Sequence, residues 1–315
     1  MKHLLSKALI TLFVTLCLIS FGAFKKTAGI NYIKTAGITP VDSFQIYVRA
    51  YSRIKSTTKK KSELKKLLTK LRNYTLKING SKSVVFQNVT YHIFVANLDS
   101  DEIQLHLYKP GADKANFFSF GALKTQLEVD KRQPLMITNA GMFTPEYEPE
   151  GLYIEENSKI FFPLDTGKSK PNANFYLKPN GVFYIDASNI PHIDSTEKLG
   201  HINEKELKKF KLATQSGPML VINGSIHKAF KYGSKNLKTR SGVGLISGNK
   251  KKIVFALTIN GTNFYDFASF FREIFNCENA LFLDGSISQM YLHDLSPKEL
   301  DGDFGPLISV CRKTK

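Results

Sequence analysis

The stretch that decides the fold reads ALFLDGSISQMYL and spans residues 280–292. Its first four residues form a short, unbroken apolar run, which predicts a strand buried on both faces. Asp284 follows directly and Gly285 comes next, so one carboxylate stands where a hydrophobic strand ends in a turn. A buried carboxylate costs free energy unless hydrogen bonds offset it. Asp284 is therefore either a turn residue that accepts backbone N–H groups or a functional acid, base or ligand-orienting group.

Apolar strands that end in polar residues and glycine occur five times in the chain. The five segments are TNAGMF (138–143), ATQSGPML (213–220), TRSGVGL (239–245), TINGTNFYDF (258–267) and LDGSISQM (283–290). Glycine-containing turns at strand ends allow backbone N–H groups and short side chains to converge on a ligand. One such turn is usually only a turn, but five in one domain favour a shared binding or catalytic site.

The remaining pattern predicts an α+β fold, a single domain with a mixed, hairpin-rich sheet and a few helices. Four hairpins are expected, with their turns at 99–101, 155–158, 179–181 and 223–224. Apolar residues at helical spacing predict helices over 120–131 and 264–275. The run 307–313 is expected to form a short edge strand.

Three regions are expected along the chain. Residues 1–24 join a short basic start to an apolar run, as in a signal peptide or an uncleaved membrane anchor, and predict an exported protein that is periplasmic, membrane-anchored or secreted. Residues 25–85 form a basic, partly helical extension, with Ser62 as a helix N-cap. This helix would either pack on the protein with a solvated basic face or lie on anionic lipid headgroups, giving membrane association through the N-terminus. Residues 86–315 form the main domain.

The net charge of +17 belongs almost wholly to the N-terminal part of the chain. Residues 1–85 carry 17 Lys and Arg against two acids, whereas residues 86–315 carry 27 against 25. A nearly neutral main domain argues against nucleic-acid binding. Phosphate-binding loops of the Walker or dinucleotide type are also absent from the sequence.

The cysteines and histidines give no indication of a metal site. Cys277 and Cys311 are expected to be two buried free thiols or, in an oxidising compartment, a disulfide. No Cys and His spacing resembles a zinc site, so no cofactor is expected. A divalent cation bound by Asp284 and amide oxygens stays open but is not indicated.

The polar residues of the five segments could bind a phosphate, a carboxylate or sugar hydroxyls. The guanidinium of Arg240 could bind a phosphate or carboxylate through two hydrogen bonds. The structural alternative is a salt bridge to a surface acid. Asn139 and Gln215 offer neutral amides to sugar hydroxyls. Three serines are phosphate-binding groups or simple turn residues: Ser216, Ser286 and Ser288.

A serine nucleophile is a weaker hypothesis. The segment GSISQ lacks the G-x-S-x-G elbow of serine hydrolases. Seven histidines are scattered over the chain, so a pair of Ser288 with a histidine stays open.

The ordered series NAGMF, PEGLYI, NFYLKPNGVF, QSGPMLVING, RSGVG and NFYDFASFFREIFNCENALFLDGSISQMY resembles the phosphodiester glycosidase family. The resemblance covers residues 89–310 and is greatest to an exported bacterial branch. It implies an α+β fold whose cleft is built by the strand-end turns, and hydrolysis of the glycosidic bond of a phosphodiester-linked sugar. Where the family has glycines after the Asp-Gly pair, this chain has Ser286 and Ile287, which narrows the space above the turn.

The resemblance and the residue chemistry together give the expected site. The expected catalytic residues are Asp284, Arg240, Asn139 and Glu150, with Glu150 as the second carboxylate. The expected substrate-binding residues are Gly141, Gln215, Ser216, Gly244, Gly285, Ser286 and Ser288. The partner would be a small-molecule or polymeric glycoconjugate. The alternatives are a non-catalytic glycan- or glycolipid-binding envelope protein and, third, a serine hydrolase.

Overall fold

The computed structural model describes residues 44–45, 47–49, 51, 61–111, 114–155, 159–171, 173–295 and 300–313. These residues belong to one compact unit that begins at Phe44. The export segment expected over residues 1–24 and the hairpin tip expected at 156–158 lie outside the described residues. Among the residues described, no helix is both long and apolar enough to cross a membrane.

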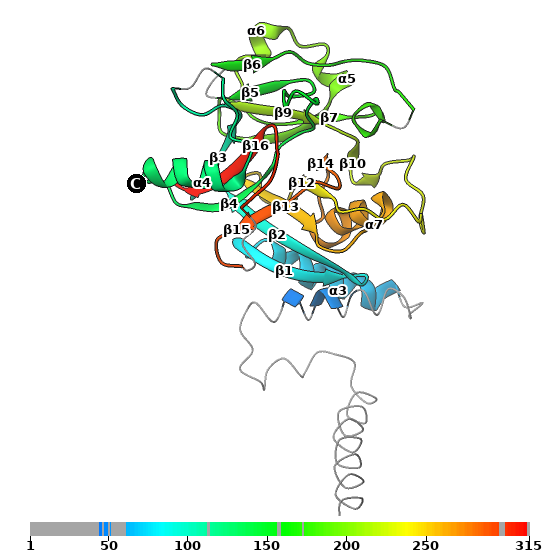
Figure 1. Ribbon diagram of the computed structural model, residues 1–315. Coiled ribbons are helices and arrows are strands. Elements are labelled where there is room, and N and C mark those ends of the chain that lie inside the picture. Colours follow the sequence, from blue (N-terminus) through cyan, green and yellow to red (C-terminus); the bar gives the residue numbers. More distant parts are fainter. Residues whose placement is uncertain are drawn as a thin grey trace, which may run out of the picture. The chain divides into compact units, whose positions relative to one another are not determined.

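Three sheets form the fold, and every pairing between the described strands is antiparallel (Figure 1). The first sheet has the order β1 (Gly80–Phe86), β2 (Val89–Asn97), β13 (Lys252–Thr258), β12 (Ser241–Leu245), β14 (Ala280–Asp284), β10 (Met219–Ile222) and β11 (Ser225–Ile226). The second has the order β15 (Met290–Leu292), β4 (Pro134–Asn139), β16 (Leu307–Arg312) and β3 (Asp101–His106). The third has the order β6 (Ile160–Phe162), β5 (Tyr153–Glu155), β9 (Leu212–Ser216), β7 (Gly181–Ile185) and β8 (Pro191–Ser195).

Short helices accompany these sheets. They are α3 (Lys61–Thr75), α4 (Phe120–Val129), η3 (Asn174–Tyr176), α5 (Thr196–Leu199), α6 (Glu204–Leu207), α7 (Phe264–Ser269) and the π-helical η4 (Phe270–Ile274). The expected α+β class is confirmed, but three antiparallel sheets replace the single mixed sheet. The helices expected over 120–131 and 264–275 are also confirmed, as α4 and as α7 with η4.

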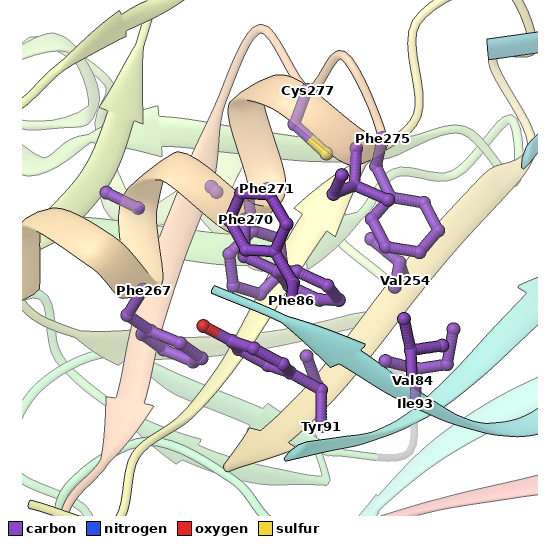
Figure 2. Close-up of a cluster of buried hydrophobic side chains, with 14 of the residues drawn as sticks. Val84, Phe86, Tyr91, Ile93, Val254, Phe267, Phe270, Phe271, Phe275 and Cys277 are labelled. Atoms are coloured by element: carbon purple, nitrogen blue, oxygen red, sulfur yellow. The ribbon is translucent and has the colours of Figure 1, made fainter. Parts of the chain in front are cut away.

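Aromatic side chains of α7 and η4 pack on the first sheet and form its core (Figure 2). The ring of Phe270 stacks on that of Tyr91 from β2, with 3.8 Å between centroids. Cys277 is buried in the same cluster, whereas Cys311 is buried in the cluster beneath α4. Both thiols are free, so the free-thiol alternative is confirmed.

The helix α3 packs on this core through its apolar face. Leu71 is fully buried, and Leu64, Leu67, Leu68 and Tyr74 contact the cluster. The strand β1 pairs with β2 along its full length and α3 packs on the core, and both belong to the compact unit that begins at Phe44. Both fall within the region predicted as a basic extension. The helix begins at Lys61, so Ser62 lies inside it and not at the N-cap.

Three expectations about pairing were wrong. The strands β2 and β3 do not form a hairpin, because β2 pairs with β1 and β13 while β3 pairs with β16 of another sheet. The residues before β7 form η3, so 179–181 is not a hairpin turn. The strand β16 lies between β4 and β3 and is not an edge. The strands β2 and β16 take partners from distant parts of the chain, β13 for β2 and both β3 and β4 for β16, which local turn signals do not reveal. The strand β7 instead forms its hairpin with the following strand, β8.

Candidate functional site

Side-chain hydrogen bonds connect the ends of β4, β9 and β14. The backbone N–H of Gly141, just after β4, donates to Thr214 Oγ1 on β9 at 2.9 Å. Ser216 at the end of β9 donates to the carbonyl of Leu283 on β14 at 2.7 Å. Three of the polar segments therefore meet at one place, although they are far apart in the sequence.

The end of β14 is tied in turn to the start of β12. The backbone N–H of Asp284 donates to Ser241 Oγ at 3.1 Å, and Ser241 Oγ lies 2.9 Å from Ser288 Oγ. Asn139 Oδ1 accepts the backbone N–H of Gln289 at 3.0 Å, which returns the network to β4. The structure thus brings together three predicted residues, Asp284, Ser288 and Asn139.

The carboxylate of Asp284 is desolvated and only half satisfied. Its Oδ1 accepts the Gly285 backbone N–H at 2.6 Å, as in the turn-residue interpretation. Its Oδ2 is buried without a hydrogen-bond partner among the described residues. Burial raises the pKa of Asp284 to about 6, and the Gly285 N–H offsets only part of that rise. A carboxylate with one unused oxygen and a pKa near neutrality is a candidate for acid–base or nucleophilic chemistry.

The guanidinium of Arg240 is buried, with 2% of the residue exposed, and forms no salt bridge within the described residues. It lies 3.7 Å from the ring centroid of Phe264, a cation–π contact. Its Nε donates to the Thr262 carbonyl at 2.8 Å, and one terminal nitrogen, Nη2, donates to the Asn236 carbonyl at 3.1 Å. Burial lowers the pKa of Arg240 to about 10, which leaves it positively charged at neutral pH. The salt-bridge alternative is excluded for the described residues.

Gln215 uses its amide to join two loops. Its Oε1 accepts the backbone N–H groups of Leu152 and Asp165, at 2.9 and 3.0 Å, and its Nε2 donates to the Asp165 carbonyl at 2.7 Å. Gly151 lies against this amide with φ +112°, and a Cβ there would fall 2.4 Å from Gln215 Oε1. The amide therefore positions the loops that carry Glu150 and Asp165.

The loops also carry two carboxylates, and the charge of Asp165 acts on Glu150. Glu150 is half-buried, and burial together with the charge of Asp165 raises its pKa. Asp165 accepts the Tyr176 hydroxyl at 2.7 Å and the Gly167 backbone N–H at 2.5 Å. Asp165 and Tyr176 were not predicted as site residues. Asp165 lies outside every segment that the sequence singled out, and Tyr176 lies in NFYLKPNGVF without having been given a role.

The predicted glycines differ in their surroundings. A Cβ on Gly141 would lie 2.0 Å from the carbonyl oxygen of Gln215, so only glycine fits there. A Cβ on Gly244 would meet Phe271 and Cys277 at 2.6 and 2.8 Å, which places Gly244 in the core and not beside Asp284. Gly285 has room for a side chain, because its nearest contact would be at 3.7 Å.

No predicted serine is paired with a histidine in the described part of the chain. Ser288 contacts Ser241, and Ser286 is exposed. His106 Nε2 lies 2.8 Å from Ser309 Oγ, but Ser309 is fully buried and burial lowers the pKa of His106 to about 3. This pair lies between β3 and β16, within the second sheet.

A cavity of about 680 Å³ is lined by Arg72, Arg272 and Glu273 among others, and by none of the predicted site residues. Tyr51 donates to Glu273 Oε2 beside it at 3.0 Å. The described residues contain no cluster of three or more His, Cys, Asp or Glu side chains able to hold a metal ion.

Comparisons with known proteins bear on this site. The sequence model of a family described as phosphodiester glycosidase matches residues 133–306, which include every predicted site residue. The chain is 33% identical over 232 residues to the uncharacterized protein YigE of Escherichia coli (strain K12), covering 71% of this chain and 83% of that protein.

Two solved structures are similar at low identity. One is the catalytic domain of zebrafish N-acetylglucosamine-1-phosphodiester alpha-N-acetylglucosaminidase, auto-inhibited by pro-peptide, with a TM-score of 0.49, 14% identity and coverage of 75% of this chain and 82% of that chain. The other is a hypothetical protein from Synechocystis, with a TM-score of 0.47, 12% identity and coverage of 74% and 61%.

Proposed function

This chain belongs to the phosphodiester glycosidase family, and from that membership we propose that it hydrolyses the glycosidic bond of a sugar-1-phosphodiester or a related envelope glycoconjugate. The observation that carries the proposal is the carboxylate of Asp284. It lies where the polar strand ends meet, its pKa is raised to about 6, and its Oδ2 has no partner among the described residues. Burying an ionised carboxylate costs free energy, and carboxylates with a pKa raised in this way are common among catalytic residues.

The proposed reaction needs little general-acid catalysis. The bond between the anomeric carbon and a phosphate oxygen breaks, and water supplies the new hydroxyl on that carbon. The products are a free sugar and a phosphomonoester. Because the phosphate is already a good leaving group, an ionised carboxylate that stabilises an oxocarbenium-like transition state or activates the nucleophile is the main requirement. Asp284 has this role in the proposal, as base, nucleophile or electrostatic stabiliser.

Positive charge and hydrogen-bond donors for the substrate come from Arg240 and Asn139. Nη1 of Arg240 forms no hydrogen bond within the described residues, so it is left for a phosphate oxygen. Nδ2 of Asn139 is buried and has no partner there either, which leaves a donor for a sugar or phosphate oxygen. Ser288, bonded to Ser241, would position the substrate and not attack it.

Glu150 is the second carboxylate of the proposal. Its raised pKa suits a group that delivers a proton to the departing phosphate or takes one from water. Gln215 and Ser216 act as framework in this scheme, because their side chains already bond to Asp165, Leu152 and Leu283.

The setting proposed for this reaction is outside the cytoplasm. The basic start and apolar run of residues 1–24 support export, with the protein periplasmic, membrane-anchored or secreted. Envelope glycoconjugates are accessible to a protein in that location.

The test is a screen of the purified full chain against a panel of glycosyl-1-phosphodiesters, with release of free sugar and phosphomonoester as the readout. We expect turnover of at least one member and a loss of about 100-fold or more in Asp284→Asn. Asp301→Asn, which neutralises an exposed carboxylate, is the matched control and should keep its activity. Binding of envelope glycans without cleavage across the panel would instead favour the non-catalytic alternative. Fluorophosphonate labelling lost in Ser288→Ala would favour a serine hydrolase.

A further inference from the structure

The loop of residues 228–238, which precedes β12, is basic and contains no acid. Its four lysines, Lys228, Lys231, Lys235 and Lys238, are all exposed. The sequence has no Asp or Glu between Glu206 and Asp266. No ion pair or side-chain hydrogen bond of these lysines is found within the described residues. Their charge is therefore not neutralised by any acid in the described part of the chain.

Exposed apolar side chains lie on the same loop and on its neighbours. Tyr232 is 80% exposed and Leu237 is 57% exposed. Ile259 follows β13 and is 48% exposed, and Ile287 follows β14 and is 50% exposed. Four of the six large apolar residues exposed in the described part of the chain thus lie on three loops. Single exposed apolar residues are ordinary, but their concentration beside unpaired lysines marks an interaction surface.

These loops adjoin the proposed active site and are fixed in place there. Phe230 at the start of the loop stacks on Phe264, with 4.9 Å between centroids. Near the end of the loop, the backbone carbonyl of Asn236 accepts a hydrogen bond from Nη2 of Arg240. Lys238 and Thr262 exchange two backbone hydrogen bonds. Arg240 therefore positions the loop in addition to any contact with substrate.

The turn that carries Ile287 is connected to the same strand ends. Ser288 bonds to Ser241, which follows Arg240 and lies opposite Asp284 in the pairing of β12 with β14. The basic loop, the turn after β14 and the carboxylate are thus parts of one connected region.

We propose that the 228–238 loop, with Ile259 and Ile287 beside it, docks on an anionic lipid bilayer and presents membrane-borne glycosyl phosphodiesters to Asp284. Unpaired lysines are attracted to anionic headgroups, while tyrosine and aliphatic side chains enter the interfacial layer. A soluble anion would account for the lysines but not for the apolar residues between them. The inference rests on the proposed function and narrows its substrate to a lipid-linked class.

The chain offers a direct probe of docking, because it contains no tryptophan. In a full-length Tyr232→Trp variant, the emission of the single tryptophan reports the polarity around the loop. We expect a blue shift on mixing with phosphatidylglycerol vesicles and none with pure phosphatidylcholine vesicles. The matched control is Val129→Trp at the end of α4, a position that is 70% exposed and outside these loops. Its emission should not change with either vesicle.

Charge variants separate this surface from the basic helix α3. In the Tyr232→Trp background, Lys231→Gln, Lys235→Gln and Lys238→Gln together should weaken the vesicle response by roughly fivefold for each lysine. Added salt should weaken it further, because it screens exposed charges. Lys65→Gln, Lys66→Gln and Lys70→Gln on α3 remove the same charge and should leave the response unchanged.

Three outcomes would overturn the inference. The first is no emission shift in Tyr232→Trp with anionic vesicles, and the second is an equal shift in Val129→Trp. The third is a shift produced by soluble dextran sulfate but not by vesicles, which would indicate a soluble polyanion as the partner. None of these assays uses turnover. A protein that docks but cleaves no glycosyl phosphodiester would contradict the proposed function and leave docking intact, whereas one that cleaves soluble substrates without docking would do the reverse.

Discussion

Ser241 Oγ accepts the backbone N–H of Asp284 across the pairing of β12 with β14, at 3.1 Å. The register of this pair shifts directly beside the contact, since Gly242 lies opposite Phe282. Leu283 is left without a partner on β12, and its carbonyl accepts the hydroxyl of Ser216 instead. This irregularity in the ladder is what lets β9, β12 and β14 meet around one carboxylate.

Ser241→Ala should therefore impair the site without removing any proposed catalytic group. The backbone N–H of Asp284 would lose its acceptor and Ser288 would lose its partner, at a cost of about 1–3 kcal/mol in the free energy of unfolding. We expect a fall in kcat/KM on a glycosyl-1-phosphodiester and a lower urea midpoint. Ser225→Ala, which removes an exposed hydroxyl from β11, is the control. Equal behaviour of the two variants would contradict the role given to Ser241.

Asp284→Asn should raise stability while it removes activity. The pKa of Asp284 is raised from 3.8 to about 6, so the unfolded chain loses this proton first as the pH rises. Asp284 therefore lowers the free energy of unfolding progressively between about pH 4 and pH 6, and by about 3 kcal/mol above that range. Urea unfolding at pH 7 should show Asp284→Asn more stable than the wild type, and the difference should shrink towards pH 4. A less stable variant at pH 7 would mean that the ionised carboxylate is well solvated or paired.

The pH dependence of turnover follows from the same carboxylate. If Asp284 acts in its ionised form, kcat/KM should fall about tenfold for each pH unit below about 6. If kcat/KM instead falls only near the ordinary pKa of aspartate, Asp284 is not the titrating group. A rise in activity towards lower pH would assign it the role of the acid.

The place of Asp284 at the end of a buried strand was easier to predict from the sequence than the strand partners. Asp284 and the strand-end turns were predictable because an apolar run followed by polar residues and glycine is a local signal. Ser241 lies in such a segment, TRSGVGL, yet its contact with Asp284 depends on the register of two strands and could not be predicted from sequence spacing. The same holds for Arg240, whose stacking on Phe264 was not expected.

Asp165 shows most clearly why part of the site could not be predicted. Its place beside Glu150 depends on Gln215, which is 50 residues away in the chain and bonds to its backbone. No turn or periodic pattern marks such a contact. The misjudged hairpin of β2 and β3 has the same cause, because each strand has better partners elsewhere in the chain.

Gln215→Ala tests the framework role of that amide. The variant would leave the buried N–H of Leu152 and the partly buried N–H and carbonyl of Asp165 without this partner, which should lower the free energy of unfolding by about 2–4 kcal/mol. Gln126→Ala on α4 removes a single exposed hydrogen bond and should change it by less than about 0.5 kcal/mol. Chemical denaturation of both variants is the measurement. A mild effect in Gln215→Ala, with activity lost, would point instead to direct contact with the substrate.

Two glycine variants distinguish structural glycine from open space. In Gly141→Ala the new methyl group would lie 2.0 Å from the backbone oxygen of Gln215, so the loop after β4 must shift, at a cost of about 3 kcal/mol. In Gly285→Ala the nearest contact is an ordinary 3.7 Å, and the residue does not have a positive φ, so thermal unfolding should match the wild type. If Gly285→Ala is stable but loses turnover, the volume above the Asp284 turn is occupied by substrate. If Gly285→Ala unfolds at a lower temperature than the wild type, the backbone requires glycine at this position. The space above the Asp284 turn is then not limited by Ser286 and Ile287 alone.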